Sequence, residues 1–96
     1  MSDLEMTNFA NKAKEFCFQG MKMDVTCIWS LARYLLKKEE VGGFLTAVLE
    51  NDLAKAVSRA DEYNILNIPA YVAFIYNHFP AVAWGSPEKV KNWLNS

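Results

Sequence analysis

Apolar residues recur every three or four positions along almost the whole chain, and this spacing restricts the fold more than any other feature. Such a period places them on one face of an α-helix, whereas a half-buried strand needs strict alternation of apolar and polar residues. No segment of the sequence sustains that alternation. The pattern therefore predicts an all-α fold, a compact bundle of about five to six short helices.

Length and charge narrow the class of protein further. The 96 residues suffice for one domain, residues 1–96, and the 52% hydrophobic content is high enough for a core without a metal or disulfide staple. The formal net charge is −1, whereas proteins that depend on phosphate contacts carry a surplus of Lys and Arg. Composition therefore excludes intrinsic disorder and disfavours nucleic acid as a partner.

The first part of the chain is expected to form two amphipathic helices. The first covers residues 3–19 and ends at Gly20. Its expected inward face is Leu4, Phe9, Ala13, Phe16 and Cys17. The second covers residues 24–39, with Asp24 as its N-cap and two lysines near its C-terminus. Its expected inward face is Ile28, Leu31, Ala32, Leu35 and Leu36.

Two polar interruptions divide the middle of the chain. Gly42-Gly43 is expected to close the second helix and reverse the chain in a tight turn, with one glycine at a positive φ. Helical spacing then continues across Asn51-Asp52, which leaves either one long helix or two short ones open. Because Asn and Asp compete for backbone hydrogen bonds, we favour a break, with Asn51 as the cap of a helix over residues 52–62. Its expected inward face is Leu53, Ala56, Val57 and Ala60.

Prolines mark the starts of the last two helices. Asn67, followed by Pro69, begins a nearly all-apolar helix that ends at Phe79 and that we place at the centre of the bundle. The hydroxyl of Ser86 and the ring of Pro87 begin the final helix. Its expected inward face is Val90, Trp93 and Leu94.

Residues that carry common catalytic chemistry are few. His78 is the single histidine, and Cys17 and Cys27 have no second CxxC or histidine cluster beside them. These residue types do not build a multi-histidine or four-ligand zinc site, so we expect no catalytic residue, no metal and no cofactor. His78 is interpreted as a residue favourable to the dipole at the end of its helix.

The expected compartment is the cytoplasm. The N-terminal segment has no secretory signal, so both cysteines are expected to be reduced, packed thiols. The most hydrophobic stretch, residues 68–76, is about half as long as a bilayer span, so no membrane is expected as a partner.

Several side chains are candidates for binding a protein partner. Trp29 lies off the main stripe of its helix and Trp84 lies in the connection after Pro80, so each is either a core residue or an interface anchor. Arg59 either pairs with a neighbouring acid, while Asp61 caps the next turn, or holds a partner carboxylate. Between residues 39 and 62, six acidic residues accompany two basic ones, which favours a basic partner surface. The full candidate set is Trp29, Glu39, Glu40, Asp52, Arg59, Asp61 and Trp84.

Two blocks of the sequence resemble a known group of proteins. They are GGFLTAVLENDLAKAVSRADEYN, residues 42–64, and YNHFPAVAWGSPEKVKNWL, residues 76–94. The chain is similar to small bacteriophage and prophage proteins over about residues 34–94, and residues 1–20 lie outside the resemblance. The resemblance implies a phage-encoded accessory protein of the bacterial cytoplasm. By analogy, such a protein binds a host or antiviral-defence protein without catalysis, as an anti-CRISPR-like inhibitor does. A self-assembling homodimer and a nucleic-acid-binding regulator are the alternatives.

Overall fold

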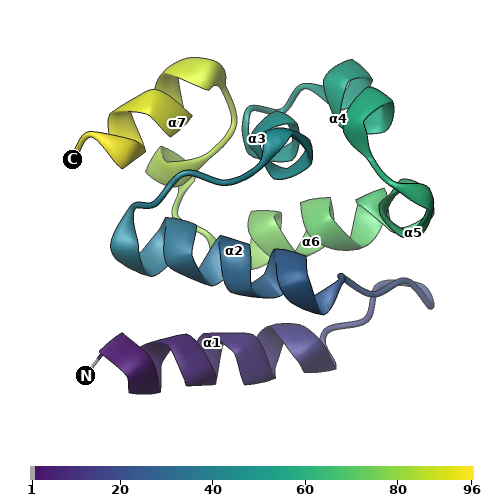
Figure 1. The fold of residues 1–96 in the computed structure, drawn as a ribbon, viewed down its shortest axis with the longest axis horizontal. Helices are drawn as coiled ribbons and strands as arrows, with labels where there is room; N and C mark the ends of the chain where they lie inside the picture. Colours follow the sequence, from purple (N-terminus) through teal and green to yellow (C-terminus); the bar gives the residue numbers. More distant parts are fainter. Residues whose placement is uncertain (1) are drawn as a thin grey trace.

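Short helices joined by tight turns make up the chain in the computed structural model, which describes residues 2–96 (Figure 1). In chain order they are α1 (Ser2–Glu15), α2 (Val25–Lys37), α3 (Gly43–Leu49), α4 (Leu53–Arg59), α5 (Glu62–Ile65), α6 (Ile68–His78), a 3-10 helix (Ala81–Ala83) and α7 (Pro87–Leu94). α1 and α2 are antiparallel neighbours, whereas α7 lies at one end of the domain and α4 and α5 lie at the other (Figure 1). The predicted all-α class is confirmed, and the seven α-helices of residues 2–96 slightly exceed the five to six expected.

The connection between α1 and α2 is a tight turn. Phe18 and Met21 exchange two backbone hydrogen bonds of 2.9 Å. Gln19 and Gly20 between them have φ angles of 51° and 85°, as a two-residue hairpin turn requires. Because the chain leaves the helix to enter this turn, α1 ends at Glu15 and not at residue 19 as predicted.

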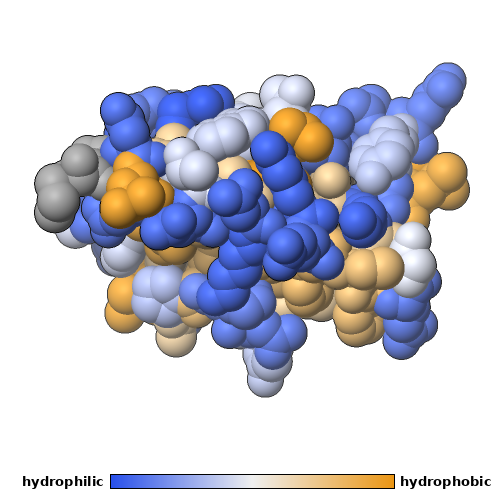
Figure 2. Space-filling view, turned by 90° about the horizontal axis from the view of Figure 1, so that it is seen from below, coloured by the Kyte–Doolittle hydropathy of each residue, from blue (hydrophilic) through white to orange (hydrophobic). Residues whose placement is uncertain are grey.

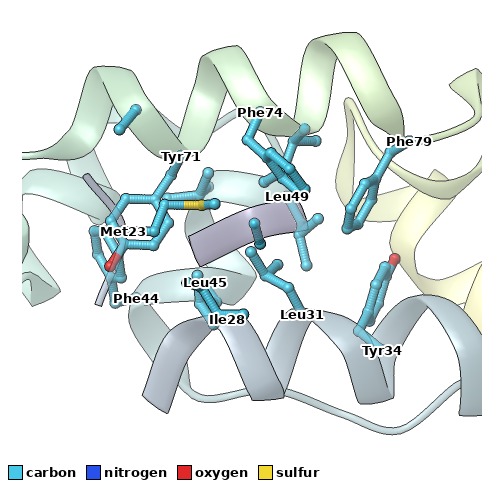
Figure 3. Packing of buried hydrophobic residues seen from close by; sticks show 14 of the residues in the cluster. Met23, Ile28, Leu31, Tyr34, Phe44, Leu45, Leu49, Tyr71, Phe74 and Phe79 are labelled. Carbon is cyan, nitrogen blue, oxygen red and sulfur yellow. The ribbon is translucent and has the colours of Figure 1, made fainter. Parts of the chain in front are cut away.

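The core lies between α2, α3 and α6. Figure 3 shows side chains of α2 and α6 pointing toward one another, with Leu49 of α3 between them. The largest fully buried side chains are Tyr34, Tyr71, Phe74, Ile28, Leu31, Leu49 and Ile75. The predicted face of α2 is confirmed at Ile28, Leu31 and Ala32 but not at Leu36, which is exposed while Tyr34 is buried. Tyr34 can be buried because its hydroxyl donates a 2.6 Å hydrogen bond to the carbonyl oxygen of Ala83.

The buried face of α1 differs from the predicted one. Leu4 is 66% exposed, and the buried side chains of this helix are Met6, Ala10 and Ala13. These three residues follow a helical stripe that faces α2, and the larger Phe9 and Phe16 flank it, half-buried. Cys17 lies beyond the end of the helix and is exposed, so the prediction of a packed thiol is wrong at this position. Cys27 is half-buried against the core.

Lys38, and not the glycine pair, reverses the chain after α2. Its φ of 56° is left-handed, and its N–H donates to the carbonyl oxygen of Tyr34 at 3.1 Å. Gly42 has a φ of −68° and precedes α3, and Gly43 is the first residue of that helix. The predicted positive φ at this pair is therefore wrong, because the reversal is complete before the glycines are reached.

The segment after α3 contains two short helices where one was predicted. Asn51 has a φ of 62°, and Asp52, not Asn51, caps α4 by accepting a 3.1 Å hydrogen bond from the N–H of Lys55. Asp61 then caps α5, as predicted, by accepting a 2.7 Å bond from the N–H of Asn64. In α4 only Ala56 is buried, and the predicted inward residues Leu53 and Val57 are exposed.

The remaining helix starts agree with the prediction. Asp24, Asn67 and Ser86 are the N-caps of α2, α6 and α7, and proline stands in the first turn of the latter two. In α7, Val90 is buried and the other two predicted inward residues are half-buried. α6 is not enclosed by the bundle, because Tyr76 on its outer face is 71% exposed.

Candidate functional site

The two tryptophans predicted as core or interface residues occupy intermediate positions. Trp29 is half-buried against the core, and the ammonium of Lys14 lies 5.6 Å from the centre of its ring. Trp84 is also half-buried and meets the ring of Tyr76 edge-on, with 6.2 Å between ring centroids. Trp84 therefore adjoins exposed aromatic surface on α6, whereas Trp29 is covered by a cation from α1.

Three of the predicted acidic residues have partners within the chain, and two of these are helix caps. Asp52 and Asp61 cap α4 and α5. Glu39 is exposed and lies 3.9 Å from the Nε of Arg33, a surface pair that contributes little to stability. Glu40 and Glu50 share one hollow, Asp52 lines a second and Asp61 a third. The acidic residues are thus spread over several sites and do not form one patch.

Among the described residues, Arg59 does not pair with a neighbouring acid, which was the structural role predicted for it. Within residues 2–96 its guanidinium forms no ion pair with an acid, so the expected pairing is wrong. Its side chain lies against Gly43, where a Cβ would stand 3.2 Å from its Cδ. Together with Cys27 and Asp61 it lines a hollow of about 240 Å³. The absence of a side chain at Gly43 leaves the space that the Arg59 stem occupies.

The buried polar groups near this hollow form a closed ring of hydrogen bonds. The Asp24 N–H donates to the Tyr71 hydroxyl at 2.8 Å, and that hydroxyl donates to Oδ1 of Asn64. The Asn64 amide donates to Sγ of Cys27 at 3.7 Å, and the Cys27 N–H donates to the Asp24 carboxylate at 3.4 Å. Burial raises the pKa of the Cys27 thiol and of the Tyr71 hydroxyl, so both are protonated at neutral pH. The ring joins α2, α5 and α6 and has the arrangement of a structural network.

His78 packs at the end of α6 against two phenylalanine rings. Its ring centroid is 4.6 Å from that of Phe74 and 6.1 Å from that of Phe16. Partial burial, and then the positive charge of Lys12, lower the pKa of His78. The charged form that would interact with the helix dipole is therefore disfavoured.

The outer face of α6 carries a largely apolar hollow. A shallow depression of about 390 Å³ is lined by Phe18, Pro69, Val72, Ala73, Tyr76 and Asn77. Val72, which is 42% exposed, also lines a smaller hollow with Leu53 of α4. We call this area the α6 surface and define it as Phe18, Leu53, Pro69, Val72, Ala73 and Tyr76. Figure 2 views the molecule from the α1 side and shows hydrophilic side chains over the upper and central parts of this face, with hydrophobic side chains gathered along much of its lower part.

The α6 surface has the composition of a protein-binding site. α6 contains no Lys, Arg, Asp or Glu, and no charged side chain lines the larger hollow. Exposed apolar patches on small domains mark interaction sites, and tyrosine is enriched among the residues that dominate binding energy. Of the predicted partner residues only Trp84 adjoins this surface, through Tyr76, and only Asp52 lines its smaller hollow. Sequence reasoning missed Val72 and Tyr76 because it assigned the whole apolar helix to the core.

No group of three or more His, Cys, Asp or Glu side chains within residues 2–96 is arranged to hold a metal ion. No helix in the described part of the chain has the length and apolar character needed to cross a membrane. No family model, no curated protein and no solved structure matches the chain.

Proposed function

We propose that this chain is a phage-derived accessory protein that binds a bacterial host or antiviral-defence protein through the α6 surface and modulates it without catalysis. The observation that carries the proposal is an uncharged helix face on which Tyr76 and Val72 are exposed beside an apolar hollow. The phage origin, the bacterial cytoplasm and an anti-CRISPR-like mode of inhibition rest on the sequence resemblance. An interface of this kind acts by covering part of its target.

The energetics favour the α6 surface over the scattered candidate charges. Fully burying an exposed side chain such as valine or phenylalanine contributes about 1.5–3 kcal/mol of hydrophobic free energy. Val72 and Tyr76 are 42% and 71% exposed, so a partner that covers both buries roughly the area of one such side chain. An exposed ion pair contributes at most about 1 kcal/mol, since both groups are well solvated. Val72 and Tyr76 together therefore have a larger effect on affinity than Glu39, whose carboxylate already lies beside Arg33.

The proposal is tested by capture followed by a direct affinity measurement. The immobilised protein is exposed to bacterial lysate, the bound protein is identified by mass spectrometry, and the purified pair is measured by calorimetry. Tyr76→Ala and Val72→Asp are each expected to weaken binding at least tenfold, since each removes or charges buried apolar area. Leu4→Ala is the matched control, because Leu4 is 66% exposed on α1, outside the α6 surface. Two folded α6 variants that bind as tightly as the control would refute the proposal.

A homodimer through the same surface is the second candidate. A two-fold interface places identical surfaces opposite each other, and the uncharged α6 face brings no like charges together there. Sedimentation equilibrium distinguishes the two functions: a stable dimer that Val72→Asp dissociates supports the homodimer, and a monomer at all concentrations supports the host-binding protein. A salt-sensitive gel shift would instead favour a nucleic-acid-binding regulator.

A further inference from the structure

A second hollow lies where the chain leaves α2 and passes between α3 and α7. It has a volume of about 290 Å³ and shares no lining residue with the α6 surface. Val41, Val90 and Leu94 supply apolar walls, and Tyr34 contributes to the lining from the core. Its size is near the lower limit of ligand pockets and suits one long side chain. We call it the acidic pocket.

The charges around the acidic pocket are unequal. Glu40 and Glu50 line it together with a single cation, Lys91. Within residues 2–96 none of the three is in an ion pair, so both carboxylates are available to a ligand. Burial, and then the negative charge of Glu50, raise the pKa of Tyr34 to about 12, so the field of this carboxylate reaches the pocket lining. The pocket therefore combines apolar walls with an excess of one negative charge.

We propose that the acidic pocket receives an arginine side chain of the partner protein, an inference that rests on the proposed binding function. Long basic side chains bury their methylene stem along apolar surface and keep the charged head among polar groups, which matches walls of valine and leucine beside two carboxylates. Arginine fits better than lysine, because its planar guanidinium presents several donors at once and is more weakly hydrated. The pocket thus supplies a charge-selective contact, while the α6 surface supplies apolar area.

The test uses N-acetyl-L-arginine amide as the probe and the amide resonances of the isotopically labelled full chain as the readout. Saturable shifts are expected at Glu50, Val90 and Lys91, which lie in the pocket wall. N-acetyl-L-citrulline amide, a neutral probe of nearly the same shape, is expected to bind much more weakly because it lacks the charge. Absence of saturable shifts at these residues, or equal binding of the two probes, would overturn the proposal.

Matched variants locate the contact. Glu50→Gln is expected to weaken probe binding about fivefold, because a charge-assisted hydrogen bond is replaced by a neutral one. Glu40→Gln is also expected to weaken probe binding. Lys91→Gln is expected to strengthen probe binding, because it removes the cation that competes with the probe. Glu62→Gln is the control, because it makes the same charge change on α5, away from the pocket. If Glu50→Gln and Glu40→Gln both bind the probe as Glu62→Gln does, the assignment is wrong.

The same titration separates this inference from the proposed function. Tyr76→Ala leaves the acidic pocket intact and is expected to bind the probe like the parent protein. If the parent protein binds the probe but α6 variants do not weaken binding of any partner, the acidic pocket is supported and only the α6 proposal is refuted. If Tyr76→Ala weakens partner binding but the parent protein does not bind the probe, the α6 proposal is supported and the acidic-pocket proposal is refuted.

Discussion

Replacing Tyr71 with phenylalanine removes a single oxygen atom from the closed ring of hydrogen bonds. That oxygen accepts from the N–H of Asp24 at 2.8 Å and donates to Oδ1 of Asn64, which is itself buried. The aromatic side chain of Tyr71 is fully buried and packs edge-on against that of Phe44, with 5.2 Å between the centroids of the two aromatic rings. The substitution therefore leaves the packing in place and deprives two polar groups of their partner.

The expected loss follows from those two groups. A buried polar group without a partner costs about 1–3 kcal/mol. Asn64 is buried, whereas Asp24 is half-buried, so water can reach the Asp24 N–H and its cost lies at the lower end of that range. The free energy of unfolding should fall by about 2–4 kcal/mol, a large fraction of the total of about 5–14 kcal/mol expected for a domain of this size.

Urea unfolding followed by circular dichroism measures this change, and the chain offers a matched control. The Tyr63 hydroxyl donates to the carbonyl oxygen of Lys22 at 3.0 Å, but on the exposed surface, where water replaces a lost bond. Tyr63→Phe should therefore cost about 0.5 kcal/mol or less. If Tyr71→Phe is no more destabilising than Tyr63→Phe, the hydrogen-bonded ring does not stabilise the fold and the reasoning fails.

Two further predictions concern the glycine pair and alkaline pH. Gly43→Ala should be less stable than Gly42→Ala, because its Cβ would stand 3.2 Å from the Arg59 Cδ and displace that side chain, whereas a Cβ at Gly42 meets no atom within 4 Å. Equal melting temperatures of the two variants would contradict this. The pKa of Tyr34 is raised from 10.0 to about 12, so the folded state favours the neutral phenol, and the stability that this gives is complete below pH 10 and lost as pH rises toward 12. Between pH 10 and pH 12, the unfolding free energy of Tyr34→Phe should fall less steeply than that of the parent protein, because the variant has no phenol to ionise. Parallel plots of unfolding free energy against pH for the two proteins would show that Tyr34 does not titrate as described.

Local signals in the sequence were sufficient for the fold class and for most helix starts. Asp24, Ser86 and the Asn67–Pro69 segment begin their helices as predicted. Each of these signals acts over about three residues, between a cap side chain and the first helical turn, and so is independent of the rest of the molecule. Asp61 was predicted correctly as a cap for the same reason.

Which face of each helix is buried was decided only by tertiary packing. Apolar residues on α1 allow two overlapping faces, and contact with α2 selected Met6 and Ala10 over Leu4. The chain reversal after α2 fell on Lys38 and not on Gly42-Gly43, because a helix end can be closed by any residue that the fold holds in the left-handed region.

The candidate site depends even more on the tertiary structure. The residues of α6 show that this helix is apolar, but whether Val72 and Tyr76 are covered depends on how many neighbours surround the helix. In so short a chain, α2 and α3 cover its inner side and leave its outer face open. Likewise, Glu40 and Glu50 are ten positions apart. Only the packing of α7 against α3, and the hydrogen bond from the Trp93 indole of α7 to the carbonyl oxygen of Tyr34 in α2, enclose the pocket that they share. Hydrophobic periodicity shows which residues of a helix lie on its apolar face. Whether that face is exposed, and which residues of other helices lie beside it, is set by elements distant in sequence. The α6 surface and the acidic pocket could therefore be found only in the folded chain.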